Sequence, residues 1–142
     1  MPDPGHVEFV KNMITGASQA EAAILIVDVE EGVKEQTKRH SYMLSMLGLE
    51  QVVVVLNKMD LVGFSQERFD EVKTDVQIWL KSIDIESDIY IPISAIEGEN
   101  ITVKSEKMAW YKGKTFLESL DTLKNKKPAE DKELLFPVQD VY

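Results

Sequence analysis

The sequence predicts an α/β fold in which a parallel sheet is covered by helices on both faces. Two continuous apolar runs of strand length support this prediction, one at 22–29 and one inside 51–60, which reads QVVVVLNKMD. Such runs are apolar on both faces of the strand, as in parallel sheets buried between helices. A helical pattern lies between the two runs. Strand, helix and strand at short intervals indicate a βαβ unit.

Composition limits the kind of protein and partner. The 142 residues are 44% hydrophobic, enough for a domain with its own core, and the net charge is -9. Nucleic acid is therefore not expected as the main partner. The chain has no cysteine, which excludes disulfides and thiolate metal sites. No apolar run approaches the ~20 residues of a membrane span and no signal peptide is visible, so we expect a cytoplasmic setting without membrane contact.

The first residues predict a tight loop followed by a helix. Pro2, Pro4 and Gly5 disfavour regular structure. Apolar residues then recur at helical spacing up to Gly16. His6 lies at the junction, where a lone histidine is ordinarily a capping or solvated residue.

The strand predicted at 22–29 ends in an acidic turn at 28–32, and a helix follows. Its apolar stripe recurs every three or four residues, and Gly48 provides the left-handed stop expected at its end. The stripe consists of Val33, Thr37, His40, Leu44 and Leu47. We interpret His40 as a partly buried helix residue rather than a ligand.

A second helix and a third strand follow Asp60. Ser65 is predicted to be the N-cap, and the stripe behind it places Trp79 in the core. That stripe consists of Phe69, Val72, Val76, Trp79 and Ile83. A strand is expected at 88–93. The irregular stretch 101–113, with two aromatic residues, either packs onto the domain, which we favour, or forms a binding loop.

The end of the chain predicts a last helix, a linker and the start of another unit. Thr115 and Glu118 form a capping box that opens the helix. Residues 124–133 have the hydrophilic composition of a linker. Residues 134–142 are apolar again and suit an edge strand. We therefore expect one domain over 1–123, a linker over 124–133 and the first strand of a following domain over 134–142.

Polar residues follow the valine-rich strand where a parallel sheet binds its ligands. The carboxylate of Asp60 can accept two parallel hydrogen bonds, from guanine N1–H and from the exocyclic amine, a pairing that adenine does not offer. The amide of Asn57 can contact a carbonyl and a ring nitrogen or tie two loops together. The methylenes of Lys58 can lie along the base plane. The alternative is an ordinary polar turn in which Asp60 caps the backbone.

Ser94 and Ala95 follow the next predicted strand. Because the carboxyl ends of parallel strands share one edge of the sheet, we expect both residues to lie near Asp60. The Ala95 backbone N–H is then expected to reach guanine O6, and the Ser94 hydroxyl to orient Asp60. Taken alone, Ser94 and Ala95 fit any turn of small residues.

These motifs together resemble the translation-factor class of GTPases. The resemblance rests on Pro4-Gly5-His6, Lys11 to Ala17, Gln36-Thr37, Asn57-Lys58-Met59-Asp60 and Ser94-Ala95. Within that class, further segments are most similar to the GTPase subunit (subunit 1) of sulfate adenylyltransferase: 36–41, 57–62, 96–100 and 108–111. Elongation factors Tu and 1-alpha share the earlier motifs, so an elongation factor is the alternative. A degenerate, non-catalytic GTPase-like interaction module is a third interpretation.

The resemblance implies a three-layer sheet like that of P-loop GTPases, with GTP or GDP as the ligand and Mg²⁺ in the full-length protein. It implies that His6 is catalytic and positions the attacking water, and that Pro4, Gly5 and His6 belong to switch II. The guanine-binding residues would be Asn57, Lys58, Asp60, Ser94 and Ala95. The full-length protein would couple GTP hydrolysis to adenosine 5′-phosphosulfate synthesis from ATP and sulfate on a partner, the catalytic subunit. Residues from 134 would open a β-barrel domain.

The chain also departs from that family. Its 142 residues contain no G-x-x-x-x-G-K-[ST] phosphate loop and no switch I, and Pro2 stands where the family has its magnesium-linked aspartate. We therefore interpret the chain as the C-terminal two-thirds of a G domain, without the N-terminal strands, and assign no metal ligand. We expect weak or absent GTP binding and no activity. The strand at 22–29 should expose an apolar edge, through which copies could self-associate.

Overall fold

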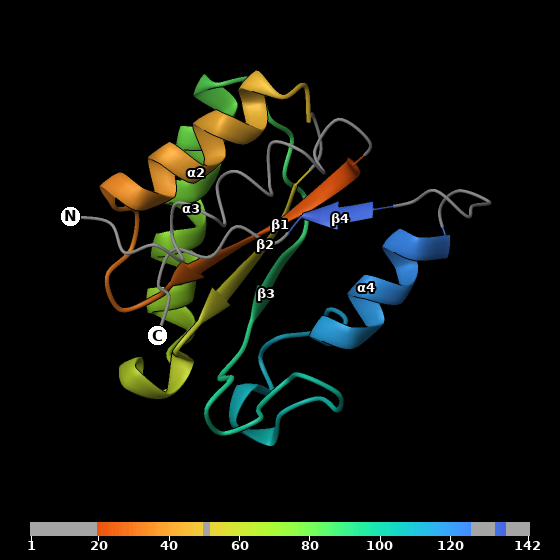
Figure 1. Ribbon diagram of the computed structural model, residues 1–142. Helices are drawn as coiled ribbons and strands as arrows, with labels where there is room; N and C mark the ends of the chain where they lie inside the picture. The colour runs from red at the N-terminus through yellow and green to blue at the C-terminus, as the bar shows by residue number, and fades with distance from the viewer. Residues whose placement is uncertain (1–19, 50–51, 126–132, 136–142) are drawn as a thin grey trace.

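The computed structural model describes residues 20–49, 52–125 and 133–135 (Figure 1). The loop, helix and His6 expected at the start of the chain lie outside the described residues. In chain order the elements are β1 (Ala20–Asp28), α2 (Glu35–Met46), β2 (Val52–Asn57), a 3-10 helix (Met59–Val62), α3 (Gln66–Ser82), β3 (Tyr90–Pro92), a 3-10 helix (Glu106–Met108), α4 (Phe116–Asn125) and β4 (Glu133–Leu135). β3 is shorter than the strand predicted at 88–93.

The strands form a parallel sheet in the order β3-β2-β1-β4. Asp28 at the end of β1 pairs with Asn57 at the end of β2, and Leu56 pairs with Pro92 at the end of β3. The three strands therefore end at the same edge. The α/β fold class with a parallel sheet is confirmed, and this register brings the loops that follow the strands together.

The valine run packs against helices on both faces of the sheet. Val52, Val54 and Leu56 belong to the core that includes residues of α2 and α3. Val53 and Val55 belong to a second core, against which Phe116 and Leu120 of α4 pack. Figure 1 shows α2 and α3 on one side of the sheet and α4 on the other. Apolar and polar residues do not alternate along this run because both faces of the strand are buried.

The predicted helix ends are present. Gly48 has φ +82° just after α2, a conformation in which a Cβ is unfavourable. Ser65 Oγ accepts a hydrogen bond from Arg68 N at 3.1 Å. In the capping box of α4, Thr115 N donates to Glu118 Oε1 at 2.9 Å and Glu118 N donates to Thr115 Oγ1 at 3.2 Å. These bonds, the one from the Thr115 backbone above all, lower the pKa of the Glu118 carboxyl.

Both tryptophans pack against the main core, as predicted for Trp79 and favoured for the stretch 101–113. Trp79 Nε1 donates to Ser41 Oγ at 2.6 Å, which joins α3 to α2. The ring centroids of Trp110 and Phe69 lie 5.3 Å apart, and Trp110 Nε1 donates to the Phe64 carbonyl at 3.1 Å. Among the described helices, none combines the length and the apolar character that crossing a membrane requires.

One edge of the sheet differs from the prediction. β4 pairs in parallel with β1, from Ala20 with Glu133 to Ala23 with Leu135, so the expected exposed edge along 22–29 is wrong at its beginning. Beyond Ala23, no strand among the described residues pairs with this side of β1. A strand of three residues is too short to show a periodic pattern in the sequence. The hydrophilic residues before β4 have the composition of a linker, so no strand was predicted to pair with β1. The domain boundaries at 123/124 and 133/134, and self-association of copies, stay predictions.

The opposite edge, β3, is blocked by its own residues. Pro92 has no N–H to offer to another strand, and its carbonyl accepts a hydrogen bond from Asn100 Nδ2 at 2.8 Å. Asn100 is buried and has φ +62°. Because an unpaired edge is a template for association, this arrangement protects the sheet beside the loop that carries Ser94 and Ala95.

The capping box gives a test of the last helix. Replacing Thr115 by Ala removes an N-cap acceptor and should lower the free energy of unfolding by about 1 kcal/mol, measured by urea denaturation. The matched control is Thr74→Ala on the exposed face of α3, where alanine favours the helix and no loss is expected. Equal stability of the two variants would contradict the assigned cap.

Candidate functional site

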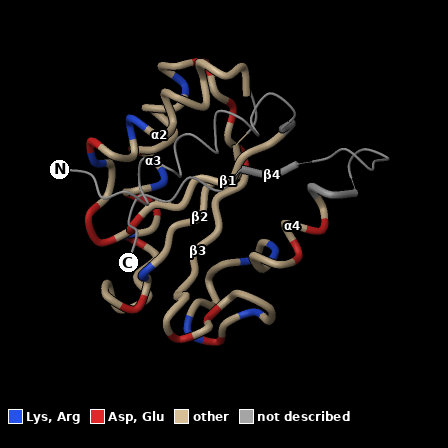
Figure 2. The backbone as a smooth tube through the Cα atoms, viewed as in Figure 1, with Lys and Arg blue, Asp and Glu red and all other residues tan. Residues whose placement is uncertain are grey.

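Three loops that follow β1, β2 and β3 meet at the carboxyl end of the sheet. Figure 1 shows β1 and β2 pointing to the lower left and β3 running downward beside them, and Figure 2 shows that the loops beyond these strands carry acidic and basic residues. Ligands of open α/β sheets bind in this position. The predicted site residues of the second and third loops therefore lie at the same edge of the sheet.

Asn57 and Ala95 join the second loop to the third. The Ala95 backbone N–H donates to Asn57 Oδ1 at 3.0 Å. Of the two possibilities predicted for Asn57, the tie between two loops is the one present. The Ala95 N–H was expected to reach guanine O6, but it donates to Asn57 Oδ1 instead. The amide group that could donate to a ligand here is Asn57 Nδ2.

Asp60 and Ser94 form a second link between the same loops. Ser94 Oγ donates to Asp60 Oδ1 at 2.8 Å, as predicted, and it also accepts from Glu97 N at 3.2 Å. Ser94 is 0% exposed, whereas Asp60 is only half-buried. Among the described residues, Asp60 Oδ2 has no hydrogen-bond partner. Asp60 is thus oriented from behind by Ser94 and keeps acceptor capacity, rather than capping its own turn.

Lys58 connects the second loop to the first. Its Nζ lies 3.1 Å from Asp28 Oδ2, and the Asp28 side chain is only 4% exposed. The Lys58 backbone has φ +70°, which is uncommon for a residue with a Cβ. Asp28 was not among the site residues predicted from the sequence; the available signal was a carboxylate at the end of the strand next to the valine run.

A small hollow of about 120 Å³ lies between the second and third loops. It is lined by Asn57, Lys58, Asp60, Leu61, Ala95 and Ile96. Ile96 is 87% exposed and Leu61 is 53% exposed, so apolar side chains border the polar ones. Both were missed by the sequence analysis, although an apolar residue directly after Ser94-Ala95 was visible. Apolar walls with a few convergent polar groups are typical of a site for a small ligand.

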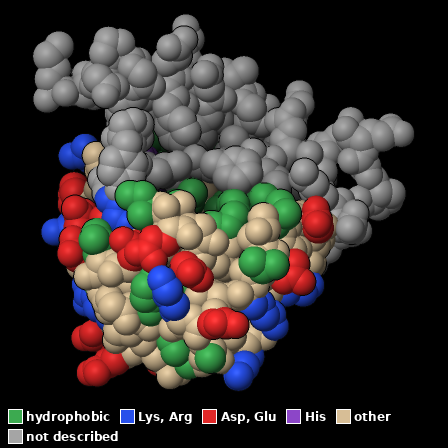
Figure 3. Space-filling view, turned by 90° about the horizontal axis from the view of Figure 1, so that it is seen from below, with side chains coloured by type: hydrophobic (Ala, Val, Ile, Leu, Met, Phe, Trp, Pro, Cys, Tyr) green, Lys and Arg blue, Asp and Glu red, His purple; other side chains and the backbone are tan. Residues whose placement is uncertain are grey.

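The third loop is closed on itself and held from outside. Ser94 and Glu99 exchange two backbone hydrogen bonds, at 3.2 and 3.0 Å. Lys107 Nζ donates to Glu97 Oε1 at 3.0 Å, and this contact raises the pKa of the Lys107 ammonium. Figure 3, viewed from this end, shows hydrophobic side chains among acidic and basic ones. The loop is therefore preorganised by its own backbone and by Lys107.

Only part of the predicted nucleotide site falls within the described residues. Pro4, Gly5 and His6 lie outside them. Within 20–49, 52–125 and 133–135, no three His, Asp or Glu side chains come together as a metal site. The half-buried carboxylate of Asp60, the amide of Asn57 and the apolar walls of the small hollow fit a planar base.

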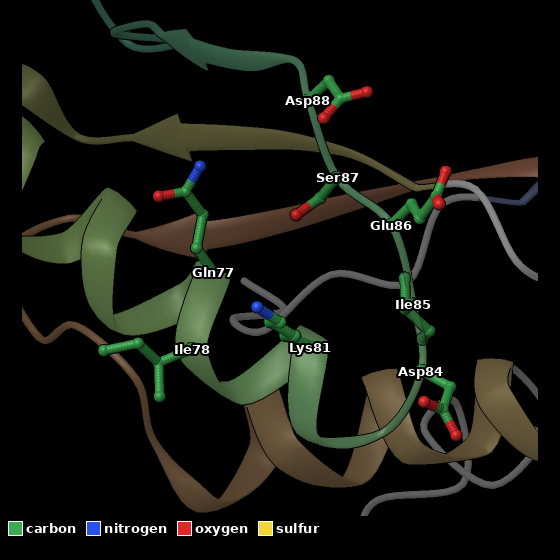
Figure 4. Close-up of a pocket in the computed structure, with 8 residues that line it drawn as sticks. All are labelled: Gln77, Ile78, Lys81, Asp84, Ile85, Glu86, Ser87 and Asp88. Atoms are coloured by element: carbon green, nitrogen blue, oxygen red, sulfur yellow. The ribbon is translucent and has the colours of Figure 1, made fainter.

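A larger hollow, of about 650 Å³, lies at the opposite end of the sheet. Figure 4 shows that Gln77, Ile78 and Lys81 reach it from α3, while its other residues come from the loop before β3, including Asp84 and Asp88. Parallel sheets rarely bind ligands at the amino ends of their strands. Its size alone therefore does not make it the functional site.

Comparison with known proteins agrees with the geometry. The sequence profile described as "Elongation factor Tu GTP binding domain" matches residues 3–128. Elongation factor 1-alpha of Pyrococcus furiosus is 50% identical over 139 residues, covering 98% of this chain and 32% of that protein. Elongation factor 1-alpha of Methanothermobacter thermautotrophicus is 51% identical over 141 residues, covering 98% of this chain and 34% of that protein. The chain thus spans about a third of the length of these relatives.

A solved structure shares the fold. The crystal structure of sup35 complexed with GMPPNP superposes with a TM-score of 0.66 at 29% identity, covering 83% of this chain and 31% of that chain. The two relatives from Pyrococcus furiosus and Methanothermobacter thermautotrophicus are both elongation factors 1-alpha. They support the elongation factor alternative better than the GTPase subunit of sulfate adenylyltransferase, which the sequence analysis placed first.

The link through Ser94 can be tested by stability. Ser94→Ala leaves the buried end of Asp60 and the Glu97 N–H without a partner, so the free energy of unfolding should fall by about 1–2 kcal/mol in chemical denaturation. Ser82→Ala is the control, because that exposed hydroxyl bonds only within its own helix, to the Trp79 carbonyl. A loss no larger than that of the control would contradict a structural role for this link.

Proposed function

Because the chain belongs to the family of elongation factor Tu GTP binding domains, we propose that it forms the guanine-reading part of a translation elongation factor GTPase. The observation that carries the proposal is the double link between the loops after β2 and β3, through Asn57 with Ala95 and Asp60 with Ser94. It places an oriented carboxylate and an amide beside one small hollow.

In this proposal Asp60 selects the base. Its carboxylate accepts from guanine N1–H and from the exocyclic amine, while Ser94 holds it from behind. Adenine has neither donor at those places, so its binding would leave Asp60 desolvated and unpaired. The Asn57 amide, fixed by the Ala95 N–H, turns its Nδ2 donor toward O6 or N7 on the other edge of the base.

The faces of the base are covered by apolar groups in this proposal. The methylenes of Lys58 lie along one face, and Ile96 covers the other. Both residues line the hollow. Ile96 is 87% exposed in the absence of a ligand, and a bound base would cover this apolar side chain.

GTP hydrolysis, magnesium binding and switch II are proposed for the whole protein. His6 is proposed to position the attacking water, with Pro4 and Gly5 shaping its loop. These roles rest on the family resemblance. The same proposal divides the chain into a G domain over 1–123, a linker over 124–133 and the first strand of a β-barrel domain over 134–142. In the described structure α4 continues to Asn125, and residues 133–135 pair with β1.

Adenosine 5′-phosphosulfate synthesis is not retained as the leading function. Its support was the likeness of 36–41, 57–62, 96–100 and 108–111 to the sulfate adenylyltransferase subunit, whereas the relatives compared above carry elongation factor names. A non-catalytic interaction module is the second class of function. Base recognition distinguishes the two classes, because a nucleotide-binding domain requires it and an interaction module does not.

The proposal predicts base selectivity in the chain itself, probed with nucleosides because they need no phosphate loop. In ligand-observed NMR titrations, guanosine should bind at least about fivefold more tightly than adenosine, since a bidentate pair discriminates bases by about 1–3 kcal/mol. Asp60→Asn should lose this preference and favour xanthosine, whose carbonyl accepts from the new amide.

The control is Asp70→Asn, which makes the same change at an exposed position on α3 and should keep the preference for guanosine. Equal binding of guanosine and adenosine by the unchanged chain would overturn the proposal. An unaltered preference in Asp60→Asn would show that the base contact is assigned to the wrong residue.

A further inference from the structure

We propose that Asp28 is a positioning residue for guanine recognition, which holds the Lys58 ammonium so that the lysine stem stays against the face of the base. The inference rests on the proposed function and deepens it, because it adds the first loop to a site built so far from the second and third. Asp28 does not line the hollow, so it acts through Lys58.

The Asp28 carboxylate is held in one orientation by its own turn. Its Oδ1 accepts from the backbone N–H groups of Glu30 at 2.8 Å and Glu31 at 3.3 Å. Its Oδ2 lies 3.1 Å from Lys58 Nζ. Oδ1 therefore accepts hydrogen bonds within the turn, and Oδ2 forms the ion pair with Lys58. With the side chain 4% exposed, the ion pair is shielded from water and salt.

The turn that carries Asp28 is fixed on two sides. Val29 N donates to the Asn57 carbonyl at 2.9 Å, which continues the ladder between β1 and β2 by one step. Arg68 of α3 donates from Nε to the Val29 carbonyl at 3.0 Å and from Nη2 to the Glu30 carbonyl at 2.9 Å. These contacts fix the backbone next to Asp28 relative to β2 and α3, and therefore fix the position of Asp28 relative to the second loop.

Lys58 needs such an anchor. A lysine side chain has many rotamers, and holding it in one of them loses conformational entropy. Its left-handed backbone, with φ +70° and ψ +34°, is also unfavourable for a residue with a Cβ. The ion pair with Asp28 fixes the far end of the stem before the base arrives. Since an interaction made in advance lowers the entropy lost on binding, the anchor should strengthen recognition.

A purely structural role for Asp28, as a cap of its own turn, makes a different prediction. Asp28→Asn keeps an oxygen for the two backbone N–H groups and loses only the charge that pairs with Lys58. Lys58→Met keeps an unbranched stem and loses the ammonium. The two variants therefore separate the turn from the ion pair.

The test is a double-mutant cycle on the whole chain, read by guanosine affinity in NMR titrations and by the midpoint of thermal unfolding. Asp28→Asn should weaken guanosine binding roughly fivefold or more, as expected for coupled neighbours, and should have no further effect in the Lys58→Met background. Glu30→Gln removes one negative charge from an exposed place in the same turn and should bind guanosine like the unchanged chain.

Two results would overturn the inference while the proposed function stands. One is unchanged guanosine affinity in Asp28→Asn. The other is an equal loss with and without the Lys58 ammonium, which would assign Asp28 to the turn alone. Should Asp28→Asn not fold, Lys58→Met decides: a similar weakening supports the anchor, and unchanged affinity refutes it. Failure of the proposed function is distinguishable, because the unchanged chain would then show no preference for guanosine over adenosine.

Discussion

The double link between the loops after β2 and β3 is the interaction on which this site depends. Asn57 receives the Ala95 N–H, and Asp60 receives the Ser94 hydroxyl, so a carboxylate and an amide are oriented before any ligand arrives. Each hydrogen bond alone contributes little net stability, about 1 kcal/mol. Their joint effect is geometric: two segments 34 to 38 residues apart in the sequence become one surface.

The sheet makes this link possible. In a parallel sheet the polar ends of neighbouring strands meet at one edge, and the register of β1, β2 and β3 aligns their last residues. Burial of the valine run on both faces fixes that register, because a slip by one residue would exchange the side chains packed under α2 and α3 with those packed under α4. The core thus positions the site without contributing a side chain to its polar contacts.

Local sequence signals were sufficient for most of the fold and for half of the site. The valine run, Gly48, Ser65 and the Thr115–Glu118 box each specify a nearby structure, and the contact of Ser94 with Asp60 followed from parallel strands alone. Other features depend on long-range placement. The pairing of β4 with β1 joins segments more than a hundred residues apart, and a strand of three residues has no measurable period. The partner of Lys58 became visible only once the register placed Asp28 beside it.

The central claim, that these loops form one slot for guanine, is tested most directly by a crystal structure of the chain grown with guanosine. The account predicts the base in the hollow between the Lys58 stem and Ile96, with N1 and the exocyclic amine within hydrogen-bond distance of the Asp60 carboxylate. A base bound elsewhere, such as in the larger hollow beside Lys81, or one in this hollow without contact to Asp60, would contradict it.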